Sequence, residues 1–291
     1  MPRLKTEAAK ESLLRRVRKQ RLNYITILPS LITILNGVCG FTAIVFASKS
    51  VKAGDSQVSY FAMGGYMVFL AMIADMLDGR VARRVKNTSS FGGQLDSICD
   101  IVSFGVAPAL LMVKVLESYL AGFADINPAA GSFLHRFIWL TAAAYVSCAA
   151  IRLARFNVEN EEDESAHMSF MGLPTPAAAG VIASLIIFHE ETFPHNAIIY
   201  ALPFLAVGAA MLMVSRIRYP HILNQYIRGK KPFAYLIRIL LFLGLIIWSR
   251  QTALVLIFCG FTASSLVKWF FYKVIRKRDT ELDFASYQNS T

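Results

Sequence analysis

Runs of about 20 apolar residues recur along this chain of 291 residues and constrain its fold more than any other feature. A helix needs a run of that length to cross the hydrocarbon core of a bilayer. The chain is 55% hydrophobic and 17% charged, which is too apolar for an ordinary soluble domain. The sequence therefore predicts an all-α, polytopic membrane bundle. Eight spans are expected, at 24–47, 59–78, 95–115, 134–154, 174–189, 197–214, 233–249 and 252–273.

Lysine and arginine concentrate in alternate loops between these spans. Eight of them precede the first span, and further groups lie at Arg80–Lys86, Arg216–Lys231 and Lys273–Arg278. Because cytoplasmic loops carry an excess of positive charge, these loops and both termini are expected to be cytoplasmic. The formal net charge of +11 is thus assigned to topology and to attraction for anionic lipid, not to binding of nucleic acid.

The same pattern divides the chain into four parts. Residues 1–23 form a basic cytoplasmic arm or an interfacial helix, and the sequence does not choose between them. Residues 24–215 form a core of six spans, residues 216–273 add two more, and residues 274–291 are a cytoplasmic tail. The four cysteines stand singly in apolar stretches without a CxxC pair, so they are expected to be packing residues and not zinc ligands.

Four aspartates lie at the facing ends of the second and third spans. Asp75 and Asp78 are three residues apart, and Asp96 and Asp100 are four apart, so each pair shares one helix face. In an antiparallel hairpin both pairs reach the cytoplasmic end. Carboxylates in or near a bilayer need a positive partner. Two Mg²⁺ or Mn²⁺ ions about 4 Å apart would suit four such ligands.

Two other interpretations of the aspartates remain open. Ion pairs with Arg80, Arg83 or Arg84 would stabilise the carboxylates without a metal. An ion-coupled transporter would use the acids as a relay, but transporters place such acids near the midplane of repeated helices, and no internal repeat is visible.

The residues between the two pairs suit a nucleotide-linked substrate. Gly79 and Ala82 remove side-chain bulk, so a flat group can approach the backbone there. Arg83 offers a planar fork for phosphate or nucleobase. Ser89, or the serine after it, and Gly92 offer hydroxyls and bare amides near the next helix start.

Residues 75–100 resemble a known signature. They match the pattern D-x2-D-G-x2-A-R-x8-G-x3-D-x3-D of the CDP-alcohol phosphatidyltransferase family. The resemblance implies a membrane enzyme that binds CDP-diacylglycerol with two divalent metals and transfers its phosphatidyl group to a small alcohol, releasing CMP. It also implies that all four aspartates are metal ligands and that Asp100 is the catalytic base. Spacing alone does not separate Asp100 from Asp96.

Further runs resemble the phosphatidylserine synthase branch of that family, which implies L-serine as the acceptor. They are Leu35–Phe41, Val102–Ala109, Arg152–Asn157 and Gly172–Ala179. In the first span, Pro29, Thr33 and Asn36 are expected to contact the CDP-lipid. Ser30 follows Pro29 where the branch often has asparagine, which leaves the cytidine contact of that turn open.

A serine acceptor has a carboxylate and therefore needs a cation in its pocket. Arg152, Arg155 and Asn157 are the candidates, although both arginines also suit snorkelling anchors at the interface. Glycerol 3-phosphate and inositol phosphate remain alternative acceptors. The expected partners are CDP-diacylglycerol, L-serine, the bilayer and a second copy in a homodimer. The expected location is the cytoplasmic (inner) membrane, with the active site at its cytoplasmic face.

Overall fold

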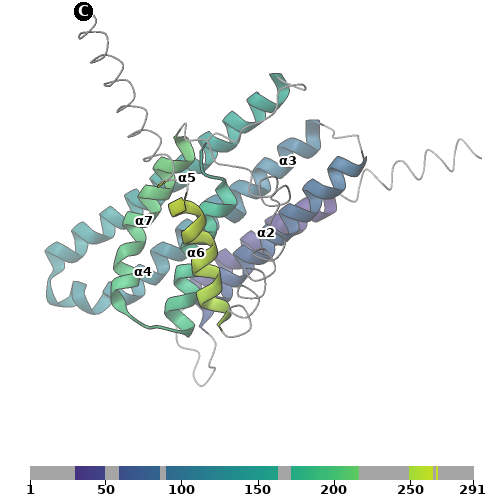
Figure 1. Cartoon of the computed structure of the whole chain (residues 1–291). Coiled ribbons are helices and arrows are strands. Elements are labelled where there is room, and N and C mark those ends of the chain that lie inside the picture. Colours follow the sequence, from purple (N-terminus) through teal and green to yellow (C-terminus); the bar gives the residue numbers. More distant parts are fainter. Residues whose placement is uncertain are drawn as a thin grey trace, which may run out of the picture.

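The computed structural model describes residues 30–49, 59–85, 90–162, 172–215, 249–264 and 267. Every regular element within those residues is helical (Figure 1). The elements are a helix at Ser30–Ser48, α2 (Tyr60–Val85), α3 (Ser90–Asp100), the π-helix η1 (Ile101–Val106), α4 (Ala107–Ile126), α5 (Pro128–Glu162), α6 (Thr175–Glu191), α7 (Asn196–Val214) and a helix over residues 250–264. The expected arm at 1–23, the tail at 274–291 and the span at 233–249, except residue 249, lie outside this description.

The prediction of a helical membrane protein is confirmed in its coarse form. Among the described residues, five segments are long and apolar enough to cross a membrane. They are Ser30–Ser48, Tyr60–Val81, Phe91–Gly122, Pro128–Val158 and Asn196–Val214. The expected span at 174–189 corresponds to α6, which has 17 residues. The expected span at 252–273 begins inside the helix over residues 250–264.

One helix begins earlier than the apolar pattern predicts. The pattern placed its start at residue 134, but α5 starts at Pro128. Proline suits a first helical position because an N–H group at that position has no intrahelical partner, so its absence costs no hydrogen bond. Asn127 Oδ1 accepts a hydrogen bond from the backbone N–H of Ala130 at 3.3 Å and so caps this start. Proline and this cap thus specify where α5 begins, ahead of the most apolar part of the helix.

Helix α6 lies in the centre of the bundle and packs closely against its neighbours. A Cβ atom on Gly65 of α2 would lie 2.7 Å from Ile187 Cγ1. A Cβ atom on Gly180 of α6 would lie 2.2 Å from the Phe258 ring. Small residues allow membrane helices to approach in this way. The close contacts fix α6 against α2, so the N-terminal Thr175 of α6 has a defined position.

The helix that carries Asp96 and Asp100 changes its geometry directly after Asp100. Residues Ile101–Val106 form a π-helix, after which α4 continues in the same direction. Short π segments inside α-helices are rare, and those that occur are often found at functional sites. Here the π segment is buried at Ser103, Phe104 and Gly105. It lies against the helix at Ser30–Ser48, since a Cβ atom on Gly40 would be only 2.6 Å from Ser103 Cα.

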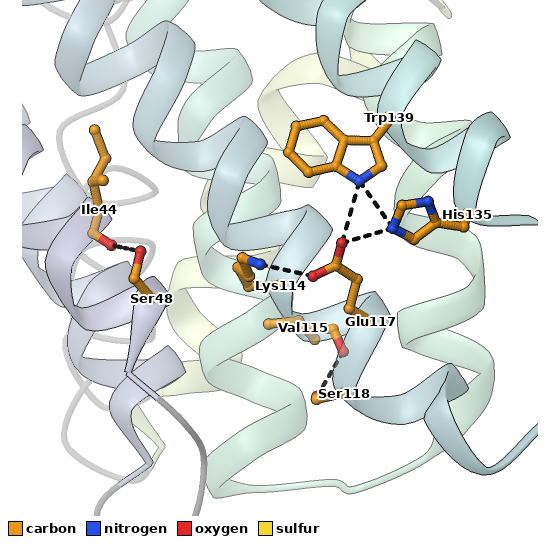
Figure 2. A network of polar contacts seen from close by, with 8 residues as sticks. All are labelled: Ile44, Ser48, Lys114, Val115, Glu117, Ser118, His135 and Trp139. Atoms are coloured by element: carbon orange, nitrogen blue, oxygen red, sulfur yellow. Dashed lines mark hydrogen bonds and ion pairs between the residues drawn. The ribbon is translucent and has the colours of Figure 1, made fainter. Parts of the chain in front are cut away.

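A polar network joins α4 and α5 away from the aspartates (Figure 2). Glu117 forms an ion pair with Lys114 at 2.8 Å and accepts a hydrogen bond from Trp139 Nε1 at 3.2 Å. At 1.5 Å per helical residue, Lys114 lies about 20 Å from Asp100 along the helix. Tryptophan and charged side chains are typical of the membrane interface. The network and the aspartates therefore lie toward opposite ends of the bundle.

Candidate active site

Three of the four aspartates meet where α2 and α3 face each other. Asp75 and Asp78 lie on α2 and Asp96 lies on α3, and one carboxylate oxygen from each lies within 4.8 Å of the others. Asp78 is only 5% exposed, and the other two are half-buried. The convergence inferred from the spacing is thus present for these three residues.

The oxygen atoms of this cluster fit a cation. Asp78 accepts hydrogen bonds from the Thr33 side chain and from the Gly79 backbone. Among the described residues, Asp78 Oδ2 and Asp96 Oδ1 are buried without a hydrogen-bond partner. Buried carboxylate oxygens without a donor are costly. Carboxylate oxygens in a compact set are also the ligands that Mg²⁺ and Mn²⁺ favour, so the donor set suits a divalent ion.

Asp100 has a different environment from Asp96. It does not belong to the set of three, although it lies close enough for the charges of Asp75 and Asp96 to act on it. It is 7% exposed, and its Oδ1 accepts a hydrogen bond of 2.8 Å from Asn36 Nδ2. The structure therefore separates two aspartates that the sequence spacing treats alike.

Arg152 is directed toward the aspartates from α5. Its NH1 donates a hydrogen bond to Thr175 Oγ1 at the start of α6. Asp75 and Asp100 both interact with its charge, and its Nε is buried without a hydrogen-bond partner among the described residues. An arginine that snorkels to the interface would expose its head group to water. Arg152 instead provides a cation inside the site.

The two residues predicted alongside Arg152 connect neighbouring helices. Arg155 NH1 donates to the backbone carbonyl of Val214 at the end of α7, at 3.3 Å. Asn157 Nδ2 donates to Ser97 Oγ of α3 at 2.8 Å. In Figure 1 the C-terminal part of α5 and helix α3 extend toward the same end of the molecule. The C-terminal half of α5 thus forms one wall beside the aspartates.

The structure describes the surroundings of only some of the other residues that were predicted to contact the CDP-lipid. A Cβ atom on Gly79 would meet no atom of the described residues within 4 Å. Thr33 is buried against Asp78, and Gly92 lies in the first turn of α3. Ala82 and Arg83 belong to α2, but their side chains lie outside the description, as do Pro29 and Ser89 altogether. Of the three arginines considered as ion-pair partners, the described Arg80 is exposed and forms no ion pair with an aspartate.

Several polar residues at the site had no role assigned from the sequence. Thr175 binds Arg152, Ser97 binds Asn157, and Ser103 Oγ donates to the backbone carbonyl of Asn36 at 2.9 Å. Each partner is distant in the chain, so no local spacing reveals the pair. Thr175 lies in the run Gly172–Ala179 that resembles the family, which was its only signal.

Comparison with known proteins identifies the family of the chain. Residues 26–216 match the family model of the CDP-alcohol phosphatidyltransferases. A protein of Helicobacter pylori named CDP-diacylglycerol--serine O-phosphatidyltransferase is 30% identical over 87% of this chain and 95% of its own length. Proteins with the same name are 32% identical in Methanocaldococcus jannaschii, over 74% of this chain and 81% of theirs, and 34% identical in Bacillus subtilis, over 69% and 92%.

Proposed function

Because the chain belongs to the CDP-alcohol phosphatidyltransferase family, we propose that it transfers the phosphatidyl group of CDP-diacylglycerol to L-serine, which yields phosphatidylserine and CMP. Relatives that bear the name of this activity come from bacteria and an archaeon and cover most of the chain. The observation that carries the proposal is the group of three aspartates within 4.8 Å, with the half-buried Arg152 near them.

Asp75, Asp78 and Asp96 would hold the divalent cations, which we propose to be two ions of Mg²⁺ or Mn²⁺. Such ions neutralise phosphate charge and stabilise the charge that develops during phosphoryl transfer. Thr33 supports this role because its hydrogen bond orients Asp78. The resemblance implies Asp100 as a further ligand, and it lies near enough to the three to contribute.

Asp100 is proposed to accept the proton of the serine hydroxyl. One of its oxygens is held by Asn36, which leaves the other for the substrate. The serine oxygen then bonds to the phosphorus of the phosphatidyl group, the pyrophosphate bond breaks, and CMP leaves. The hydrogen bond from Asn36 to Asp100 supports this direct attack, which requires no covalent intermediate.

Arg152 is proposed to bind the carboxylate of serine or the transferred phosphate. Its side chain is half-buried near Asp75 and Asp100, and its buried Nε has no hydrogen-bond partner among the described residues. Thr175 holds one nitrogen of the fork, which orients the remaining donors. Arg155 and Asn157 would complete this wall. The CDP-lipid would contact Gly79, Ala82, Arg83, Ser89, Gly92, Pro29, Thr33 and, through Asp100, Asn36.

The proposed topology has eight spans with both termini in the cytoplasm. The core at 24–215, the two further spans at 216–273, the basic arm at 1–23 and the tail at 274–291 are parts of that proposal. Its support is the distribution of lysine and arginine. With the aspartates near the cytoplasmic face of the cytoplasmic membrane, acyl chains stay in the bilayer while nucleotide and serine come from water. A homodimer is proposed as the assembly.

A screen of acceptors tests the proposed function. Purified full-length protein in detergent would be given CDP-diacylglycerol, Mn²⁺ or Mg²⁺, and serine, glycerol 3-phosphate, inositol phosphate or no acceptor. We expect release of CMP only with serine and metal. Release only with a different acceptor would reassign the substrate, and no release with any acceptor would reject the transferase and favour the transporter.

A further inference from the structure

We propose that Asn36 is a positioning residue that holds Asp100 in its reactive orientation, and not a residue that binds the CDP-lipid directly. The proposal rests on the proposed function, in which Asp100 is the base. Asn36 is 0% exposed, so no surface of its side chain is open to a lipid. Its Nδ2 donates to Asp100 Oδ1 at 2.8 Å across 64 residues of sequence.

Contacts between the two helices fix the position of Asn36 relative to Asp100. Ser103 Oγ donates to the backbone carbonyl of Asn36 at 2.9 Å, so each helix donates one hydrogen bond to the other. Gly40, one turn after Asn36, lets the two backbones meet, because a Cβ atom there would lie 2.6 Å from Ser103 Cα. Two hydrogen bonds and a close backbone contact thus set the distance from Asn36 to Asp100.

The π-helix explains why Asp100 needs this support. It begins at the residue after Asp100, where the regular α-helical hydrogen bonding changes. On its other side, the fully buried Tyr145 donates from its hydroxyl to the backbone carbonyl of Phe104 at 3.1 Å. Side chains from two neighbouring helices therefore fix a segment whose own hydrogen bonds are irregular.

An asparagine suits this task better than a charged residue. Its N–H donates to a carboxylate and orients it, but the side chain carries no charge that would neutralise a base. The other acids of the site differ, because Asp78 Oδ2 and Asp96 Oδ1 are buried without a hydrogen-bond partner among the described residues. Each of these two acids keeps a buried oxygen for a cation, whereas the amide of Asn36 orients the carboxylate of Asp100.

The experiment compares steady-state kinetics of the full-length enzyme and Asn36→Leu, which keeps the side-chain volume and removes the donor. We expect kcat to fall by about 10- to 100-fold, as for other residues that orient a reacting group. KM values for serine and CDP-diacylglycerol should stay within about threefold, since the lost interaction acts on the transition state. A raised KM for CDP-diacylglycerol with unchanged kcat would overturn the proposal and make Asn36 a lipid contact.

Two further variants keep the test decisive. Gly40→Ala changes none of the side chains that form the site. The added methyl group would force the helix that carries Asn36 away from Ser103, so the kcat of this variant should also fall. Thr42→Ala is the matched control, because among the described residues its exposed hydroxyl binds the Val38 carbonyl of its own helix alone, and the variant should keep full activity. If Asn36→Leu and Gly40→Ala both keep wild-type kcat, the proposal is wrong.

A second readout separates positioning from a general loss of structure. The rise in thermal midpoint on addition of Mn²⁺ reports chiefly on Asp75, Asp78 and Asp96, whereas the hydrogen bond of Asn36 goes to Asp100. Asn36→Leu should keep that rise while losing turnover. Loss of both would assign Asn36 a merely structural role and overturn the proposal. Failure of the proposed function itself would appear separately, as a wild-type enzyme that does not turn over serine.

Discussion

Replacing Arg152 by lysine should lower kcat/KM for serine and leave the KM for CDP-diacylglycerol unchanged. Lysine keeps the positive charge but loses the planar fork, and it cannot reproduce both the bond to Thr175 and a bidentate contact with a carboxylate. Arg152→Lys therefore tests the geometry of the proposed serine pocket and not only its charge.

The magnitude follows from the contacts that are lost. A hydrogen bond to a charged group contributes about 1.5 to 3 kcal/mol. Since each 1.4 kcal/mol is a factor of ten, losing one such bond should lower kcat/KM for serine by roughly 10- to 150-fold. The charges of Asp75 and Asp100 remain balanced by the lysine, so the loss should appear mainly as a higher KM for serine.

The assay is release of CMP over a range of serine concentrations at saturating CDP-diacylglycerol and metal. Arg136→Lys is the matched control, because Arg136 is exposed and lies about 24 Å from Arg152 along the same helix. It should behave as wild type. If Arg152→Lys leaves the KM for serine unchanged, or raises the KM for CDP-diacylglycerol instead, the assignment of Arg152 to the acceptor is wrong.

Three further outcomes are expected. Thr33→Val removes the side-chain hydrogen bond to Asp78 and should raise the Mn²⁺ concentration for half-maximal activity by about tenfold; an unchanged metal titration would contradict this role. Tyr145→Phe leaves the buried carbonyl of Phe104 without its donor, which costs about 1 to 3 kcal/mol, so the thermal midpoint in detergent should fall measurably. Gly172→Ala should destabilise more strongly, because Gly172 has φ +83° and an added Cβ would clash with the Met213 carbonyl; a midpoint equal to wild type would refute this reasoning.

The sequence predicted the parts of the fold that depend on local patterns. Apolar length located the membrane helices. The spacing of the two aspartate pairs predicted that four carboxylates converge, and three of them, Asp75, Asp78 and Asp96, form one compact group. The start of α5 was misplaced because it is specified by Asn127 and Pro128, whose capping effect does not appear in an apolar pattern.

The finer organisation of the site depends on contacts between distant residues. Asp96 and Asp100 have equivalent spacing, and contacts with distant residues distinguish them: Asp96 joins Asp75 and Asp78, whereas Asp100 accepts a hydrogen bond from Asn36, 64 residues away. The pairing of Arg152 with Thr175 likewise joins two helices, and it favours a site residue over an interfacial anchor. The π-helix after Asp100 has no sequence signal that we identified, because its geometry is set by packing against Gly40 and Tyr145.

The central claim is that Asp96 serves the metal site alone, whereas the main role of Asp100 is that of the base. Binding of Mn²⁺ and serine-dependent release of CMP, measured side by side for Asp96→Asn and Asp100→Asn, test it most directly. Both variants should lose turnover, but the loss of Mn²⁺ affinity should be much larger in Asp96→Asn. Equal loss of Mn²⁺ binding in the two variants, or full turnover by Asp100→Asn, would contradict the account.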